Sequence, residues 1–456
     1  MATREGYLCK SDGTFQHGLQ CTATILPRAN IRASNSDVFD VVVLGAGYAG
    51  LTACGDLTVA GCKVLLLEAR DRLGGRTYTA DVDSHLYEMG GAWIHWQQPH
   101  VFREMSRYGF TQMLDSNSSA VGCNYFTVTV NGNSVNMNKE EEEHDAERVF
   151  QEFCNVDGKL CRESIPFPHD PHHNPKAAKY EGMSVAQRID EIRPKLSDLE
   201  VALLVAYIGA ISGNDMETTG LFDTLRAGQS SFATAFFNKA LSSGNPSYSF
   251  DTHIASIKSH GGVVVLSTGA GGKRFAGKGV IGTIPLNVLH EVEFDPPLHP
   301  GKQAASQKGH IRFGAKFHIE ASGKALRSWD GIEAPQSRVL TVRGDGLTPP
   351  GNAHLVCFAK GSDLQPKSDA ANFAKAVENN HQMDIKQLVW HNWVADPLSR
   401  GTWCMFSPNY SFKYLATLRE SQGSIHSASS DWALGWRGFI DGAIEEGMPR
   451  GQSPTI

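Results

Sequence analysis

A short apolar run early in the chain is followed by a glycine-rich stretch and then by a helical pattern. Residues 39–44 read Phe-Asp-Val-Val-Val-Leu, and a β-branched run of this length predicts a buried parallel strand. Residues 45–50 are rich in glycine, residues 51–59 are predicted to be helical, and residues 63–67 form a second apolar run. A strand, a helix and a strand in this order indicate one βαβ unit.

Further along the chain, helical and strand periods alternate. Helices are predicted at 139–153, at 184–206 and at 431–447, where a polar stretch opens the helix. Residues 1–37 show no sustained period and are expected to be an arm or coil, and residues 162–180, rich in Pro and His, are expected to form a loop. Strands are predicted at 263–267, 279–284, 315–320, 353–358 and 388–394.

Length and composition limit the class of protein. At 456 residues the chain is longer than one core usually holds, so two domains are expected. Hydrophobic residues make up 41% and charged residues 20%, which is ordinary for a globular protein. The net charge of -6 argues against nucleic acid or an anionic membrane as a partner. We expect no signal peptide, no membrane anchor and no C-terminal peroxisomal address.

The cysteines also bear on the compartment. There are nine, they are scattered, and none forms a CxxC pair. An odd number without that spacing argues against a disulfide scaffold or a zinc site. A reducing compartment, the cytoplasm, is therefore expected.

The glycine motif reads Gly45-Ala46-Gly47-Tyr48-Ala49-Gly50. Gly45 permits a tight turn out of the strand, Gly47 leaves the backbone open to a pyrophosphate, and Gly50 lets the helix and strand pack closely. The helix N-terminus offers its N–H groups to phosphates. Glu68, at the end of the second strand, is placed to bind the ribose hydroxyls of an adenosine. Together these features predict a dinucleotide site.

The stretch after Glu68 favours flavin over nicotinamide. It reads Glu-Ala-Arg-Asp-Arg-Leu-Gly-Gly-Arg-Thr over 68–77 and resembles the second glycine motif of flavin amine oxidases. The resemblance implies that Gly74 and Gly75 approach the flavin and that Arg70 and Arg76 are available to the pyrophosphate, although one arginine can instead be structural. Residues 88–95 resemble the loop beside the flavin ring, which adds Gly91, Ala92 and Trp93 to the predicted cofactor contacts. His95, in the same loop, is expected to be a packed histidine rather than a base.

The segment from Asp431 to Glu445 is the most specific signal. It resembles the segment of monoamine oxidases that starts a helix whose N-terminus points at the flavin, where N–H groups stabilise negative charge. The resemblance assigns Asp431, Phe439 and Ile440 to cofactor binding. It also pairs Phe439 with Trp403, in the Trp-x-x-Asp…Gly-x-aromatic stretch, as an aromatic cage that aligns the amine.

Three further residues follow from the same resemblance. Lys316 corresponds to a lysine near the flavin that assists the reaction with O2, with an ordinary strand lysine as the alternative. Ile254 is added to the predicted cofactor contacts. Some amine oxidases link FAD to a cysteine just before the first cage residue, where this chain has Thr402, so non-covalent FAD is expected. Cys404 would reach that position only if the strand register slipped.

The resemblance covers about residues 38–447 and is closest to the fungal type of monoamine oxidase, through residues 431–447 and the segments at 107–108, 284–289 and 391–394. It implies an α/β fold, in which an FAD-binding Rossmann-like domain of the glutathione-reductase and amine-oxidase type is joined to an α+β substrate domain. The expected division is an N-terminal arm at 1–37, an FAD-binding domain at 38–110, 250–300 and 420–447, a substrate domain at 111–249 and 301–419, and a tail at 448–456.

The implied activity is oxidation of a primary or secondary amine to an imine, with O2 reduced to H2O2. A peroxisomal location is open by resemblance, and so is a homodimer. Two departures leave alternatives open: the chain is shorter than its relatives between about Ser212 and Gln229, along one wall of the substrate cavity, and Pro449 is expected to stop a helix that continues in the family. A remodelled, more open cavity and a damaged gene model both explain them. Another flavin oxidase or desaturase, and a silent flavoprotein, remain the other function classes.

Overall fold

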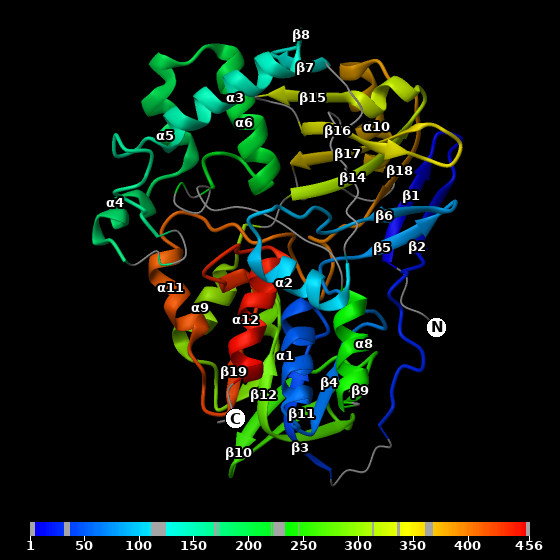
Figure 1. The fold of residues 1–456 in the computed structure, drawn as a ribbon, viewed down its shortest axis with the longest axis vertical. Helices are drawn as coiled ribbons and strands as arrows, with labels where there is room; N and C mark the ends of the chain where they lie inside the picture. The colour runs from blue at the N-terminus through cyan, green and yellow to red at the C-terminus, as the bar shows by residue number, and fades with distance from the viewer. Residues whose placement is uncertain are drawn as a thin grey trace.

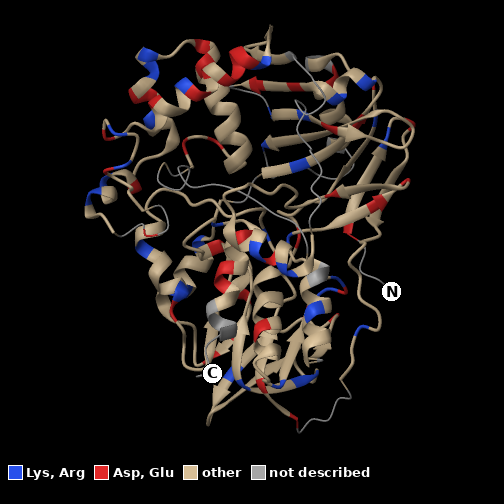
Figure 2. Ribbon diagram, in the orientation of Figure 1, with Lys and Arg blue, Asp and Glu red and all other residues tan. Residues whose placement is uncertain are grey.

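The computed structural model describes residues 5–31, 37–110, 125–167, 170, 173–219, 221, 233–244, 246–311, 314–334, 338–360 and 368–452. The strands fall into two large sheets, which occupy opposite ends of the molecule in Figure 1. Acidic and basic residues are interspersed over both halves in Figure 2. None of the described helices is long and apolar enough to cross a bilayer.

The first sheet is built around the βαβ unit that the sequence predicts. β3 (Val38–Leu44) pairs in parallel with β4 (Val64–Leu67), and α1 (Tyr48–Val59) connects them. The remaining strands are β9 (Ser247–Ser249), β10 (Ser256–His260), β11 (Val263–Ser267), β12 (Arg274–Gly282), β13 (Glu293–Asp295) and β19 (Ile425–Ser427). The order is β13-β10-β11-β12-β3-β4-β9, and β19 also pairs with β12.

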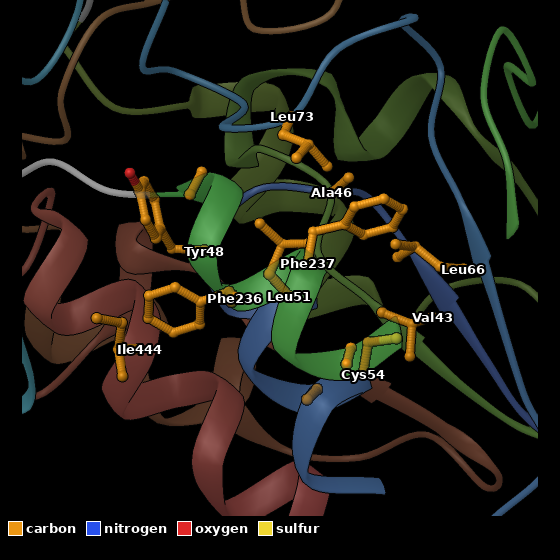
Figure 3. Close-up of a cluster of buried hydrophobic side chains, with 14 of the residues drawn as sticks. Val43, Ala46, Tyr48, Leu51, Cys54, Leu66, Leu73, Phe236, Phe237 and Ile444 are labelled. Carbon is orange, nitrogen blue, oxygen red and sulfur yellow. The ribbon is translucent and has the colours of Figure 1, made fainter. Parts of the chain in front are cut away.

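Helices α1, α8 (Ala233–Gly244) and α12 (Ile440–Gln452) lie on one face of this sheet (Figure 1). Figure 3 shows the core between them, where Phe236 of α8 and Ile444 of α12 meet the side chains of α1. Val43 and Leu66 contribute from the strands beneath. The helix packing fixes α1, and therefore the glycine turn that precedes it.

The second sheet has the order β2-β1-β18-β14-β17-β16-β15-β7-β8. Its strands are β1 (Glu5–Lys10), β2 (Phe15–Leu19), β7 (Tyr125–Val130), β8 (Asn133–Met137), β14 (Gly314–Ala321), β15 (Trp329–Ala334), β16 (Val339–Leu347), β17 (Ala353–Lys360) and β18 (Ile385–Trp390). The helices that accompany it include α3 (Lys139–Cys154), α5 (Val185–Ile192), α6 (Asp198–Ser212) and α10 (Ser368–His381). Between the two sheets lies the two-stranded hairpin of β5 (Thr79–Val82) and β6 (His85–Glu88).

The predicted coil at 1–37 is wrong for residues 5–19. They form a hairpin whose first strand pairs antiparallel with β18, placing Tyr7 opposite Trp390. The pattern of residues 5–10 is too short and too polar to predict a strand. The segment becomes a strand by pairing with β18, which lies near the other end of the chain. The predicted domain limits stay a prediction, although the strands of the first sheet fall at 38–67, 247–295 and 425–427.

Several predicted boundaries shift. The helix predicted at 184–206 is divided by the 3-10 turn Arg193–Lys195, since Pro194 cannot continue α5, and a capping box of Ser197 and Glu200 starts α6. The loop at 162–180 contains a 3-10 turn at Pro175–Ala177 and the start of α4 (Ala178–Glu181). The strand predicted at 388–394 lies at 385–390, and the one predicted at 279–284 lies within 274–282.

The C-terminal helix also differs from the prediction at both ends. It begins at Ile440 rather than 431, because Gly438 takes a φ of +81° and the chain before it turns. It continues past Pro449 to Gln452, so the expected stop is wrong. Packing holds the helix: a Cβ on Gly447 would lie 2.4 Å from the carbonyl oxygen of Ala49 on α1, and the buried Glu446 forms an ion pair with Arg419.

Candidate active site

One large cavity, of about 960 Å3, takes its lining from both sheets. A volume of this size is at the upper end of small-molecule sites. Its wall includes most of the predicted cofactor residues. These are Gly45, Gly47, Glu68, Arg70, Gly75, Arg76, Gly91, Ala92, Trp93, Ile254, Phe439 and Ile440. Lys316 and Trp403 line the same cavity, whereas Gly50 and Asp431 lie behind its wall.

The glycine turn leaves room for a ligand at the end of α1. Gly45 has a φ of +109°, and a Cβ there would lie 2.2 Å from Oγ1 of Thr283. A Cβ on Gly50 would lie 1.9 Å from the carbonyl oxygen of Gly45, so this glycine serves helix packing. Gly47 is the N-cap of α1 and has no side chain to occupy the N–H groups of the first turn. The turn therefore fits a pyrophosphate, whose charge the helix N-terminus stabilises.

Glu68 holds the turn from the other side. One carboxylate oxygen accepts a hydrogen bond from the backbone N–H of Ala46 at 2.6 Å, and the other accepts from the N–H of Arg70 at 2.9 Å. The side chain is buried but lines the cavity. Each oxygen has a further lone pair, so the carboxylate can still accept from ribose hydroxyls.

The two arginines are held by carboxylates. Arg70 is buried and forms ion pairs with Glu5 and Asp396. Although burial opposes it, the hydrogen bond from His391 and the charge of Arg70 hold the pKa of Asp396 well below its usual range. Arg70 is thus anchored structurally while it lines the cavity, which is the alternative that the sequence left open for one arginine.

Arg76 connects three parts of the site. Its guanidinium contacts Asp431 at 2.6 Å and donates to the carbonyl oxygen of Thr402 at 2.9 Å. The second carboxylate oxygen of Asp431 accepts from the N–H of Leu286 at 2.9 Å. Asp431 is fully buried and does not line the cavity, so its contact with the cavity is through Arg76, which it positions.

Lys316, on β14, is the buried cation of the cavity. Its Nζ donates to the carbonyl oxygens of Glu88 and Gly90, at 2.7 and 3.0 Å, and lies 4.9 Å from the ring centre of Trp93. Burial lowers the pKa of Lys316 to about 8, against the opposing charges of Glu88 and Asp345. The lysine can therefore exchange a proton near neutral pH.

The two predicted cage residues come from adjoining segments. A Cβ on Gly438 would lie 3.0 Å from the backbone N and O of Cys404, so the chain just before Phe439 lies against the chain just after Trp403. Both rings are half-buried and line the cavity. Their position across a flavin from each other stays a prediction.

Comparison with known proteins decides the family. The model of the flavin-containing amine oxidoreductases matches residues 48–448. The chain belongs to this family. Membership implies an FAD cofactor and makes the protein a flavin-dependent oxidoreductase of amines.

Individual relatives agree with that assignment. The amine oxidoreductase is 29% identical to a pseudooxynicotine dehydrogenase of a Pseudomonas species, over 92% of this chain and 86% of the relative. It is 26% identical to (S)-6-hydroxynicotine oxidase of Paenarthrobacter nicotinovorans, over 90% and 97%. Its fold matches a putrescine oxidase bound to putrescine with a TM-score of 0.76, at 18% identity and over 91% and 98% of the two chains.

Some cavity residues of this amine oxidoreductase were not predicted from the sequence. Thr341, Arg343 and Asp345 alternate along β16 and face the cavity, with Tyr207 and Phe358 nearby. The period of two was visible in Val-Leu-Thr-Val-Arg-Gly-Asp, but no strand was predicted there. His95 lines the cavity but is exposed, so the expected packed histidine is found only in part: its ring stacks on that of Trp436, with ring centres 5.9 Å apart.

Proposed function

We propose that this amine oxidoreductase binds FAD without a covalent link and oxidises a small primary or secondary amine to an imine, with O2 as the electron acceptor. The observation that carries the proposal is the single cavity that joins the glycine turn and Glu68 to Lys316, Trp403 and Phe439. Hydrolysis of the imine then gives an aldehyde and ammonia from a primary amine, or an aldehyde and a primary amine from a secondary one. The assignment as a monoamine oxidase, and closeness to the fungal type, are part of this proposal.

The thiol nearest the predicted attachment point supports non-covalent binding. Thr402, which lines the cavity, has no nucleophilic sulfur. Cys404 is 2% exposed, packs in a core cluster with Phe406 and Tyr410, and donates its S–H to the carbonyl oxygen of Asp431 at 3.3 Å. A buried thiol with an acceptor of its own is not available to the flavin.

When bound, FAD supplies the acceptor for the α-hydrogen of the amine as hydride. The chain's own share is orientation and exclusion of water. Trp403 and Phe439 offer ring faces to a neutral amine, and the α12 N-terminus at Ile440 offers N–H groups to negative charge at the cavity. Lys316 holds a positive charge at pH 7, which favours reduction of O2 next to it.

The acceptor needs its own test, because one of the relatives named above is a dehydrogenase and another an oxidase. The purified holoenzyme is mixed with a panel of primary and secondary amines, and flavin bleaching and H2O2 release are recorded. Bleaching with H2O2 release supports the proposal. If O2 does not reoxidise the bleached flavin but an artificial electron acceptor does, the protein is an amine dehydrogenase, and the proposal of O2 as acceptor is overturned.

Two other outcomes point to the alternative classes. Bleaching only by a non-amine would indicate a different flavin oxidase or desaturase. Bound FAD that no compound reduces would indicate a silent flavoprotein. The shortened segment that raised these alternatives lies in part, at 220 and 222–229, outside the described residues.

The non-covalent link is tested on the same preparation. Acid should release all the flavin as free FAD, and flavin that stays with the precipitated protein would refute non-covalent binding.

A further inference from the structure

One arginine of the cavity wall has no ion-pair partner among the described residues. Arg343, on β16, is half-buried and lines the cavity. Its guanidinium forms no ion pair and no hydrogen bond with any residue that the structure describes, although Asp330 lies directly opposite it on β15. Arg70 and Arg76, which line the same cavity, are both held by carboxylates. A guanidinium carries five N–H donors and keeps its charge, so Arg343 has donors available for a ligand.

The guanidinium of Arg343 is held in place by stacking on Tyr207, which also lines the cavity. The central carbon of the guanidinium lies 5.5 Å from the centre of the Tyr207 ring, on α6. The Tyr207 hydroxyl donates to the buried carboxylate of Glu142, on α3, and this carboxylate forms an ion pair with Lys139 at 2.6 Å. Stacking occupies one face of the guanidinium and leaves the N–H groups at its edge unused. Arg343 is therefore a preorganised donor for an acceptor group in the cavity.

The phosphates of FAD are expected at the other sheet. The glycine turn at Gly45 and Gly47 follows β3 of the first sheet, whereas Arg343 belongs to the second sheet. Within the second sheet, β16 is two strands away from the β14 strand of Lys316, in the order β14-β17-β16, which is about 10 Å. The acceptor for Arg343 must therefore come from the second molecule in the cavity, the substrate.

The charge of this wall favours an anionic group on the substrate. Lys316 and Arg343 are both positive at pH 7. Asp345, the acidic residue of β16 that lines the cavity, lies 3.3 Å from Nδ1 of His354 and forms no ion pair with Arg343 in the part of the chain that the structure describes. A simple alkylammonium therefore meets two cations and gains no ion pair from Arg343. A carboxylate on the substrate would instead pair with Arg343, because a guanidinium and a carboxylate match in bidentate geometry.

The amine and the anion of such a substrate would lie at separate places. Phe358 packs edge-on against Trp403, with ring centres 5.8 Å apart, and lies opposite Thr341 in the pairing of β16 with β17. Arg343 follows two residues after Thr341 on the same face of β16, which is about 7 Å along the strand. The two groups of an α-amino acid sit on one carbon and cannot span the two places. We infer, on the basis of the proposed function, that the substrate is an ω-amino carboxylate, with its amine at Trp403 and Phe439 and its carboxylate paired with Arg343.

The first experiment measures flavin reduction of the holoenzyme in stopped flow by two matched pairs, 4-aminobutanoate with butylamine and 6-aminohexanoate with hexylamine. The control for Arg343→Met is Arg274→Met, at an exposed strand arginine outside the cavity. In the wild type and the control, we expect the acid of at least one pair to half-saturate reduction at a lower concentration than its alkylamine. Arg343→Met should raise that concentration about 10–100-fold, the range for hydrogen bonds to a charged group, and should lower the one for the alkylamine, because a cation is removed. No preference for either acid in the wild type, or an equal rise for acid and alkylamine in Arg343→Met, would overturn the inference.

The spacing is tested with 2-aminohexanoate, which carries the amine and the carboxylate on adjacent carbons. We expect this α-amino acid to half-saturate flavin reduction at no lower concentration than hexylamine. A preference for 2-aminohexanoate over both ω-amino acids would refute the two separate places.

A second experiment does not depend on turnover. Hexanoate, which has no amine to oxidise, is titrated into the oxidised holoenzyme in a calorimeter. We expect hexanoate to bind the wild type and Arg274→Met at least tenfold more tightly than Arg343→Met. Equal affinity in Arg343→Met would refute the carboxylate site, whether or not amines are oxidised. If no amine reduces the wild type but hexanoate binding requires Arg343, the proposed function fails and the carboxylate site stands.

Discussion

Replacement of Lys316 by Met tests whether the cavity lysine is held at a cost to stability. The pKa of Lys316 falls from its usual 10.5 to about 8, since the folded protein disfavours the buried ammonium. At about 1.4 kcal/mol for each pKa unit, the charged lysine costs the folded state about 3 kcal/mol at pH 7. The lysine is 3% exposed, so solvent screening does not reduce this figure much. Met has a similar length and removes the charge.

The substitution also removes two hydrogen bonds, to Glu88 and Gly90. Each contributes about 1 kcal/mol, so Lys316→Met should make the apoprotein about 1–2 kcal/mol more stable at pH 7. Because the folded pKa is the lower one, the folded state binds fewer protons between pH 8 and 10.5. Wild-type stability therefore rises with pH across this window, and the advantage of the variant should vanish or reverse by pH 10.5.

Urea unfolding of both apoproteins from pH 7 to 10.5 provides the measurement, with Lys258→Met as a control at a half-buried strand lysine outside the cavity. A difference between wild type and Lys316→Met that stays constant over this range would refute the depressed pKa. The holoenzyme should separate the two half-reactions, with reoxidation by O2 slowed more than reduction by amine. Lys316 would then be a functional group that lowers stability.

Three other changes test the cofactor site and its supports. Glu68→Gln should weaken FAD binding at least tenfold in a fluorescence titration, because loss of one hydrogen bond of about 1–3 kcal/mol is enough for that change. The surface variant Glu293→Gln is the control, and equal FAD affinity in the two variants would contradict the ribose contact. Trp403→Ala should slow flavin reduction by amine by about 10–100-fold with FAD content near normal, and an unchanged rate with every accepted amine would refute the cage. Asp396→Asn should lower the free energy of unfolding by about 3–5 kcal/mol near pH 7, as it leaves Arg70 partly unpaired. This contribution should begin to fall near pH 4, where the unfolded carboxylate takes up a proton, and should be lost as pH falls through the lowered pKa of the folded carboxylate. An effect of Asp396→Asn that does not decrease between pH 4 and pH 2 would contradict the ion pair.

Local patterns predicted the βαβ unit of the first sheet well and the second sheet only in part. In the second sheet, β14 and β17 lie close to the strands predicted at 315–320 and 353–358, but β1, β7 and β16 were not predicted. The βαβ unit around Gly45 is contiguous in sequence, so a strand, a glycine turn and a helix are all visible within 30 residues. β11 is also found at its predicted limits of 263–267. By contrast, β1 depends on pairing with β18, about 380 residues away, and its own side chains carry little pattern. The end of α5 at Pro194 could have been predicted from the sequence, because Ser197 and Glu200, just after the turn, have the spacing of a capping box that starts a new helix.

The residues of the candidate site also fall into a group that the sequence predicted and a group that it did not. Family resemblance identified the residues that line the cavity along the glycine turn and near Trp403, and the structure brings them together. It said nothing of Arg343 and Tyr207, because these lie on β16 and α6, which meet only after the chain has folded. It also could not show that Arg70 is held by Glu5, a contact between the second glycine motif and a segment read as coil. Contacts of this kind depend on register, which no local period specifies.

The pairing of β1 with β18 has a consequence for synthesis on the ribosome. Tyr7 emerges among the first residues, but its partner Trp390 is made about 380 residues later, which is roughly 20 to 80 seconds at common elongation rates. During that interval the hairpin has one edge without its partner strand. Glu5 also lacks its ion-pair partner until the second glycine motif, which carries Arg70, has folded. The nascent chain therefore passes through a long stage with an open sheet edge, when a chaperone that shields strand edges would raise the yield of folded enzyme. A stop codon before β18, at codon 385 or earlier, would leave this first hairpin without its partner strand.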